Sequence, residues 1–306
     1  MTPQRLGHTA MLMLALCIGP AVAQNHPAAG LAGAGQAGHP ARGIVTEIRA
    51  KQRTVDISCD EIPGYMEPMQ MTFAVHDAKS LSALRPGMTV LFTIVDDNSV
   101  PYAEAIHPGT SEDDGAEQLQ AGGLAATGEA MDPEMAKKVV QPGEVVPDFV
   151  LTDQSGKDIH LTDMRGKVVV LTFGYSRCPF PQYCYRLSRN LSVLENRFAA
   201  RDGRDLELIT VAIDPEHDRG KVLSDYAALY RANAADWHFL TGPLPAVKQV
   251  SAYFGMYFWR QEGLLSHPLH TAVIDRGGNL VANIEGNHFT AEQLGDLVKS
   301  VMDRQP

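Results

Sequence analysis

The chain has 306 residues, a formal net charge of −10 and 44% hydrophobic residues. This length is enough for one large or two modest domains with buried cores, and the ordinary apolar fraction excludes wholesale disorder. The acidic balance argues against nucleic acid as the main partner, because phosphate binding needs clustered Lys and Arg. Four cysteines are too few for a disulfide scaffold but sufficient for one pair or one metal site.

Residues 1–23 have the pattern of a secretory signal peptide. Arg5 is followed by an apolar run over residues 9–18, a Gly-Pro pair and the small residues A-V-A before the expected cut. The run is shorter than the roughly 20 residues of a membrane span, although an uncleaved inner-membrane anchor is the alternative. Cys17 lies in this segment, so we expect a mature chain with three cysteines in an oxidising compartment, the bacterial periplasm.

The next part of the sequence has the pattern of a small β domain. Residues 24–40 are rich in Ala, Gly and His and are typical of a flexible leader. Over residues 41–107, five alternating or β-branched stretches are separated by turn residues, which predicts a closed five-stranded, OB-like β-barrel. The expected strands are residues 43–48, 54–57, 69–75, 89–95 and 102–106. Residues 108–140 are polar and small, and we expect a linker there.

Residues 141–306 alternate between strand and helix patterns. Continuous apolar runs predict buried strands at residues 167–173 and 206–213. The remaining expected elements are helices at 182–201, 221–232 and 291–302, and strands at 271–274 and 280–284. This order predicts an α/β sandwich of the thioredoxin type as the second domain.

Two cysteines lie where the first of these buried strands ends. Residues 174–184 read G-Y-S-R-C-P-F-P-Q-Y-C, and strand ends are where open α/β sheets place ligands. Pro181 suits the first helical position, so we expect Cys178 in a loop and Cys184 in the first turn, where the helix N-terminus lowers thiol pKa values. The pair is compatible with an inert disulfide, a redox pair or a metal site. His270, before strand 271–274, is a candidate third group, although taken alone it is more typical of a core or loop histidine.

Three motifs in this half resemble the Sco/SenC family. They are F-G-Y-S-R-C-P at 173–179, V-A-I-D-P-E-H-D at 211–218, and L-H-T before V-I-D at 269–275. The resemblance covers about residues 141–306. It implies a thioredoxin-fold copper-binding protein associated with assembly of the copper A centre of respiratory oxidases. It also implies that Cys178, Cys184 and His270 are the copper ligands.

The chain departs from the common family pattern at two places. The commoner loop is Cys-x3-Cys-Pro, whereas this chain has Cys-x5-Cys and matches a Cys-Pro-x-Pro-x-aromatic-Cys subgroup. His217 stands where the family has Arg or Lys, and we expect it in a polar loop away from the metal. His267 is an alternative ligand to His270.

A second sulfur cluster lies in the predicted barrel. Residues 59–71 read C-D-E-I-P-G-Y-M-E-P-M-Q-M, and Met69 and Met71 share one face of an expected strand. Thioethers beside a thiol select Cu(I) or Ag(I), whereas a Met-lined core face is the alternative. The segment resembles the CusF-type periplasmic copper-binding domain over about residues 41–107. This resemblance implies Met69 and Met71 as ligands, with Cys59 at the family's histidine position. The tryptophan that caps the metal in the founding members is absent, and Met66 nearby is a candidate fourth sulfur. Cys59 could otherwise be a resolving or regulatory thiol.

The function expected from the sequence is that of a periplasmic copper metallochaperone with two copper modules. Two thiolates and an imidazole suit Cu(I), and with an added oxygen ligand Cu(II). The expected client is a cuproprotein such as the oxidase subunit with copper A. One alternative is a thiol–disulfide oxidoreductase that keeps a client's cysteines reduced, which would make the chain an enzyme, although Cys-x5-Cys is wider than the usual redox motif. Another is copper buffering or resistance. A membrane is involved only if the signal segment stays as an anchor.

Overall fold

The computed structural model of the protein describes residues 38–96, 100–109, 139–201, 204–261 and 263–304. The predicted signal peptide and most of the predicted leader and linker lie outside these residues. All described residues belong to one compact unit, residues 36–306. Among them, no helix is both long and apolar enough to cross a membrane.

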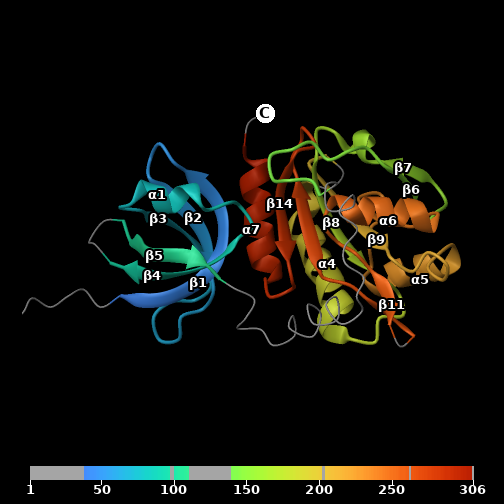
Figure 1. The fold of residues 1–306 in the computed structure, drawn as a ribbon, viewed down its shortest axis with the longest axis horizontal. Coiled ribbons are helices and arrows are strands. Elements are labelled where there is room, and N and C mark those ends of the chain that lie inside the picture. The colour runs from blue at the N-terminus through green and yellow to red at the C-terminus, as the bar shows by residue number, and fades with distance from the viewer. Residues whose placement is uncertain (1–37, 97–99, 110–138, 202–203, 262, 305–306) are drawn as a thin grey trace, which may run out of the picture. The chain divides into compact units, whose positions relative to one another are not determined.

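Residues 39–108 form a closed β-barrel with strand order β1-β2-β3-β5-β4 (Figure 1). The strands are β1 (His39–Arg49), β2 (Thr54–Cys59), β3 (Met69–Ala74), β4 (Thr89–Val95) and β5 (Tyr102–Pro108), with the short helix α1 (Ala78–Ser82) before β4. All five predicted strands are confirmed, although β1 begins four residues earlier than expected and includes part of the predicted leader. The barrel closes where β3 runs parallel to β5, and that seam has a single registered pair, Ala74 with Tyr102.

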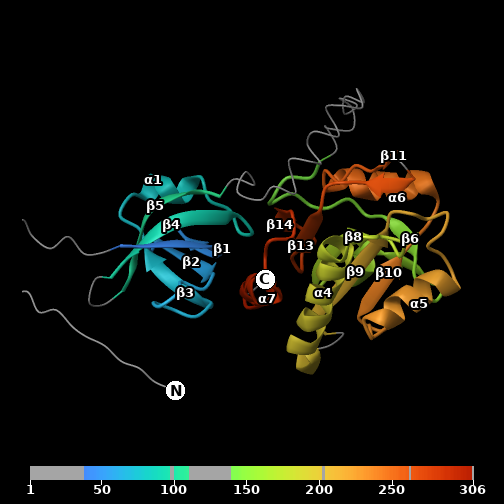
Figure 2. The ribbon, with the colours of Figure 1, turned by 90° about the horizontal axis from the view of Figure 1, so that it is seen from below.

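Residues 139–304 contain a five-stranded sheet in the order β10-β9-β8-β13-β14 (Figure 2). Its strands are β8 (Val168–Gly174), β9 (Leu206–Ala212), β10 (Trp237–Leu240), β13 (His270–Ile274) and β14 (Leu280–Glu285). β8, β9 and β10 are parallel, whereas β13 is antiparallel to β8 and β14. Together with the flanking helices, this sheet forms the α/β thioredoxin-like sandwich expected from the sequence.

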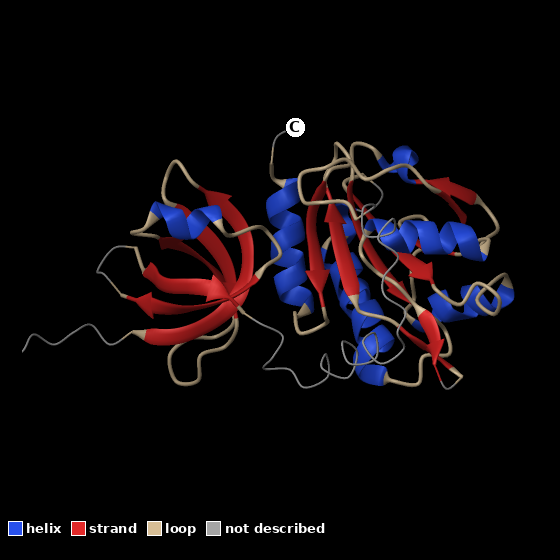
Figure 3. Cartoon of the chain, in the orientation of Figure 1, coloured by secondary structure: helices blue, strands red, loops and turns tan. Residues whose placement is uncertain are grey.

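Helices cover both faces of this sheet (Figure 3). They are α4 (Arg186–Arg197), α5 (Lys221–Leu229), α6 (Leu244–Tyr253) and α7 (Ala291–Met302). Along β8, Val168 and Val170 pack in a core with residues of α4, α5 and α7, whereas Val169 and Leu171 pack in another with residues of α6. This alternation explains why β8 is apolar at nearly every position. Shorter elements complete the domain: β6 (Val150–Thr152), β7 (Asp158–His160), η2 (Leu161–Met164), η3 (Pro181–Tyr185), η4 (Ala199–Arg201), β11 (Trp259–Gln261) and β12 (Leu264–Ser266).

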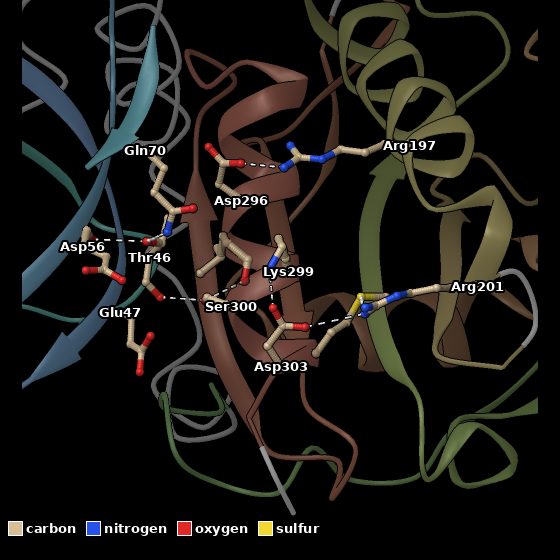
Figure 4. A network of polar contacts seen from close by, with 12 residues as sticks. Thr46, Glu47, Asp56, Gln70, Arg197, Arg201, Asp296, Lys299, Ser300 and Asp303 are labelled. Atoms are coloured by element: carbon tan, nitrogen blue, oxygen red, sulfur yellow. Dashed lines mark hydrogen bonds and ion pairs between the residues drawn. The ribbon is translucent and has the colours of Figure 1, made fainter. Parts of the chain in front are cut away.

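Hydrogen bonds join the barrel strands β1 and β2 to helix α7, and Figure 4 shows the one between Thr46 of β1 and Ser300 of α7. Ser300 Oγ donates to the carbonyl oxygen of Thr46 at 2.9 Å, and Ser58 Oγ donates to Asp296 Oδ2 at 2.7 Å. Gln293 Nε2 donates to the carbonyl oxygen of Ser58 at 3.1 Å and to Asp60 Oδ1 at 2.7 Å. Helix α7 therefore contacts the residues on both sides of Cys59.

Candidate metal sites

The first candidate site is formed by Cys178 and Cys184 after the carboxyl end of β8. Cys178 lies half-buried in the loop, and Cys184 is buried in η3, which Pro181 opens. This is the placement expected from the sequence. Both cysteines, like Cys59, are free thiols.

The two thiols have opposite pKa shifts. A hydrogen bond from the Cys184 thiol lowers the pKa of Cys178 to about 6, against the effect of burial. The Tyr175 hydroxyl, which hydrogen-bonds the same sulfur, acts in the same direction. The pKa of Cys184 is raised well above its ordinary value, because the thiol shares its proton with Cys178 and is buried. At neutral pH the pair therefore holds one thiolate and one thiol.

The loop before Cys178 is held by carboxylates that follow β9. The backbone N–H of Ser176 donates to Asp218 Oδ2 at 2.8 Å, and its hydroxyl donates to the same carboxylate. Arg177 donates through Nε to Asp214 Oδ2 at 3.2 Å and also through Nη2. Arg260 of β11 reaches the other oxygen of Asp214 at 3.4 Å. These contacts fix the loop on which the thiolate lies.

His217 belongs to the same polar turn. Its backbone N–H donates to the carbonyl oxygen of Asp214 at 2.9 Å. This position agrees with the expectation of a polar loop residue.

His270 is the first residue of β13 and is buried. Its Nδ1 lies 3.2 Å from Asn283 Oδ1, and Asn283 in turn donates to the carbonyl oxygen of Phe254 at 2.8 Å. Within the described part of the chain, no three His, Cys, Asp or Glu side chains lie close enough together to hold a metal ion. The structure thus pairs the cysteines but does not gather them with His270 into a formed three-ligand site. The role of His270 stays a prediction.

His267 lies beside Tyr175, the tyrosine that hydrogen-bonds Cys178. Its ring centroid is 6.1 Å from that of Tyr175, in an edge-on arrangement, and its Nδ1 is 2.7 Å from the carbonyl oxygen of Pro268. Burial lowers the pKa of His267 to about 4, so its imidazole is neutral at pH 7. A neutral imidazole is the form that can bind a metal.

The second candidate site lies in the barrel. Strand register pairs Cys59 with Met69 and Ile57 with Met71, so the three sulfur-bearing side chains lie on one face of the β2–β3 ladder. Cys59 is 1% exposed, whereas Met69 is 52% exposed. A methionine that is half in solvent does not act as a core residue, which disfavours a Met-lined core face at this position.

Met66 lies in the connection between β2 and β3. Its backbone N–H donates to the carbonyl oxygen of Ile62 at 3.0 Å, and the turn between them uses Gly64 at φ 77°. Met66 and Met71 both pack against the barrel core that contains Cys59. Burial raises the pKa of Cys59 to about 12, with Asp60 adding to the shift, so this thiol stays protonated in the metal-free protein.

Sequence reasoning missed two groups that shape the thiol pair. Tyr175 and Arg260 were not singled out, because their roles depend on the loop and the β11–β12 hairpin coming together in space. Tyr175, three residues before Cys178, was the one signal available.

Comparison with known proteins places both parts of the chain. The SCO1/SenC family model matches residues 137–303, and the model described as copper binding periplasmic protein CusF matches residues 38–108. The SCO1 protein homolog of Bacillus subtilis is 31% identical over 99 residues, which are 32% of this chain and 49% of that protein. Mitochondrial protein SCO2 of Saccharomyces cerevisiae is 28% identical over 167 residues, 52% of this chain and 53% of that protein.

The chain thus spans about half the length of these two relatives. Among solved structures, Arabidopsis thaliana ScoI with copper bound aligns with a TM-score of 0.46 and 23% identity, covering 53% of this chain and 100% of that one. The SCO1/SenC match extends over more than half of the 306 residues. The chain therefore belongs to the SCO1/SenC family.

Proposed function

We propose that this protein is a periplasmic copper chaperone that delivers copper to a cuproprotein client, such as the oxidase subunit with copper A. The observation that supports this most strongly is the hydrogen-bonded pair of Cys178 and Cys184 at the sheet end. A thiolate beside a second thiol is a soft donor set that selects Cu(I) over hard cations. Binding by both sulfurs releases the proton that they share.

In this proposal His270 is the third ligand of that site. Asn283 already holds its ring through Nδ1, and such contacts orient metal-binding histidines. The copper cargo would draw the loop of Cys178 and the start of β13 together.

The barrel is the second copper module in this proposal. Cys59, Met69 and Met71 supply one thiol and two thioethers on one face, and Met66 adds a further sulfur from the turn. Match to the CusF model supports copper as the cargo and the periplasm as the location. Two sites on one chain meet at roughly millimolar effective concentration, which favours transfer within the chain.

A Cu(I) titration of the reduced mature protein tests the proposal. We expect two tight sites in the wild type. The thiol-pair knockout (Cys178→Ser/Cys184→Ser) and the barrel knockout (Cys59→Ser/Met69→Ile) should each retain one site. Met164→Leu, in the sheet core, is a control that should retain both. An unchanged stoichiometry in both knockouts would refute the proposal.

A thiol–disulfide oxidoreductase is the second candidate function. The half-exposed Cys178 with its lowered pKa and the buried Cys184 behind it have the arrangement of an attacking and a resolving thiol. His270→Ala separates the two functions. Copper affinity at the thiol pair should fall under the chaperone proposal, whereas disulfide reduction should continue under the oxidoreductase proposal. A buffering protein would bind copper as the wild type does but would not load a client's copper site.

A further inference from the structure

The two segments that contain most of the candidate copper ligands have opposite charge. Residues 59–71 contain three acids and no Lys or Arg, whereas residues 176–189 contain three arginines and no Asp or Glu. We propose that these two surfaces of one chain dock on each other, so that copper passes directly from the barrel to the thiol pair. This inference rests on the proposed function. The acids are Asp60, Glu61 and Glu67, and the arginines are Arg177, Arg186 and Arg189. Asp60 is already within 4.0 Å of Arg42, and Arg177 is paired with Asp214, so the docking depends on Glu61 and Glu67 meeting Arg186 and Arg189.

Each surface combines exposed charges with exposed apolar groups. On the barrel side, Tyr65 is 36% exposed and Met69 is 52% exposed, and Glu61 and Glu67 are exposed beside them. An apolar centre with complementary charges at the rim is typical of protein interfaces, where the charges steer the encounter. Met69 lies in this surface, so an incoming sulfur can reach copper held there.

The surface around Cys178 has the matching composition. Phe180 is 42% exposed and Tyr185 is 52% exposed. Arg186 and Arg189 are exposed on the first turn of α4. Arg186 donates to the carbonyl oxygen of Phe289 at 3.5 Å, a contact that does not neutralise its charge. The positive surface stands out because the chain as a whole carries a net charge of −10.

A short segment before and within α7 contacts both surfaces, which favours a partner loop from the same chain. Gln293 donates to Asp60 at 2.7 Å in the acidic loop. Four residues earlier, the carbonyl oxygen of Phe289 accepts from Arg186 at the start of α4, in the basic segment. Through their contacts with residues 289–293, the acidic segment and the arginines that it would meet are already close together in the folded chain.

The transfer itself is an exchange of ligands. Bonds from copper to the barrel sulfurs of Cys59, Met66, Met69 and Met71 break as bonds to Cys178, Cys184 and His270 form, and copper stays Cu(I) throughout. Cys184 gives up its proton on binding and Cys59 takes one up on release, so with Cys178 entering as a thiolate the protons balance. No oxidant or reductant is needed.

Carbodiimide cross-linking of the full-length protein tests the docking without copper. Arg186→Lys/Arg189→Lys keeps the charge and supplies amines that form an amide bond only with a carboxylate in contact. We expect links to Glu61 or Glu67 in the monomer, identified by mass spectrometry. Arg204→Lys, an exposed position in the turn before β9, is the matched control and should give none. Links at the control level only, or links confined to covalent dimers, would overturn docking within one chain.

Charge reversal tests the consequence for copper transfer. The thiol-pair knockout loaded with Cu(I) serves as donor and the barrel knockout as acceptor, so the same surfaces meet between two chains. At low salt, Arg186→Glu/Arg189→Glu in the acceptor should slow transfer about tenfold, the lower end of electrostatic steering. Adding Glu61→Lys/Glu67→Lys to the donor should restore most of the rate.

Two failures are distinguishable in this assay. If either starting variant binds no Cu(I), the proposed function is wrong. If both bind Cu(I) and the charge reversals leave the rate of Cu(I) transfer unchanged, the docking is wrong and the proposed function stands.

Discussion

The two candidate sulfur sites differ in which sulfur is exposed to solvent and in the pKa values of their thiols. In the barrel the thiol of Cys59 is buried and its pKa rises to about 12, while the thioether of Met69 faces solvent. In the thioredoxin-like domain the half-buried Cys178 has a pKa of about 6, while Cys184 lies behind it with its proton. The difference comes from the surroundings, because the barrel gives Cys59 little besides an apolar core, whereas Cys178 receives hydrogen bonds.

This contrast suggests how copper would enter and leave each site. A neutral thioether binds Cu(I) without losing a proton, so under the proposed function the barrel would take up metal through Met69 before Cys59 is deprotonated. Cys178 is a ready thiolate and a stronger donor. Under the proposed function, the barrel site would therefore capture copper and the thiol pair would retain or deliver it.

The largest expected effects come from the separate cores that support the two sites. Phe73 is fully buried in the barrel, and Trp237 is fully buried in the sheet domain, where Nε1 donates to Thr210 Oγ1 at 3.0 Å. Truncating either to Ala should cost about 3–5 kcal/mol in the free energy of unfolding. Urea unfolding followed by alkylation would show Cys59 exposed first in Phe73→Ala, while Cys184, which is buried in the folded sheet domain, stays protected. Equal exposure of both thiols in each variant would mean that the two cores unfold as one unit.

Alkylation of the metal-free protein compares the two thiols directly. At pH 7 the pKa values of about 6 for Cys178 and about 12 for Cys59 give thiolate fractions that differ by about 10⁵. The greater nucleophilicity of the more basic thiolate offsets about 10³ of this, so Cys178 should react about 10²-fold faster. Its rate should rise with pH through about 6 and then level off, because the thiolate is fully formed above that pH. Similar rates at pH 7 would remove the contrast between the sites.

A smaller effect is expected at the contact between β2 and α7. Ser58→Ala removes the hydrogen bond from Ser58 Oγ to Asp296 Oδ2, next to Cys59. Because the acceptor is charged, the loss should be about 1.5–3 kcal/mol in barrel stability. Thermal unfolding measures it, with the exposed Ser82→Ala of α1 as control. A Ser58→Ala protein as stable as the control would show that α7 does not support the strand that bears Cys59.

The smallest effect concerns the start of α7. Thr290 caps this helix by accepting from the backbone N–H of Gln293 at 3.2 Å, and Gln293 Oε1 accepts from the Thr290 backbone N–H in return. Thr290→Ala should cost about 1 kcal/mol. Thr290→Ser, which keeps the hydroxyl cap, should have nearly the wild-type free energy of unfolding in chemical denaturation. If both substitutions cost the same, the threonine methyl group matters more than the cap.

Most of the fold follows from sequence periodicity, and the exceptions have physical reasons. The barrel strands and β8 were predictable because their apolar residues alternate or run continuously. Strand β10 was missed because it has only four residues and includes His238, whose imidazole lies 3.5 Å from Asp153 and Glu207. The three apolar residues of this strand, interrupted by a buried histidine, are too few to show a periodicity.

The candidate sites were predictable to the level of which sulfurs lie together. Strand-end position predicted the meeting of Cys178 and Cys184, and spacing on a strand predicted a shared face for Met69 and Met71. The pairing of Cys59 with Met69 depends on the register across the turn at residues 60–68, which sequence alone does not specify. The hydrogen bond from Tyr175, likewise, arises only in the folded chain.

The seam between β3 and β5 affects how often β3 separates locally from the rest of the barrel. With one registered pair on that side, β3 is held almost wholly by β2 and leaves most of its outer backbone groups unsatisfied by a neighbouring strand. Amide hydrogens of β3 should therefore exchange with deuterium sooner than those of β2. A metal ion bound by both Cys59 and Met69 would hold β3 against β2. The rate of amide exchange along β3 would then show whether the barrel has metal bound.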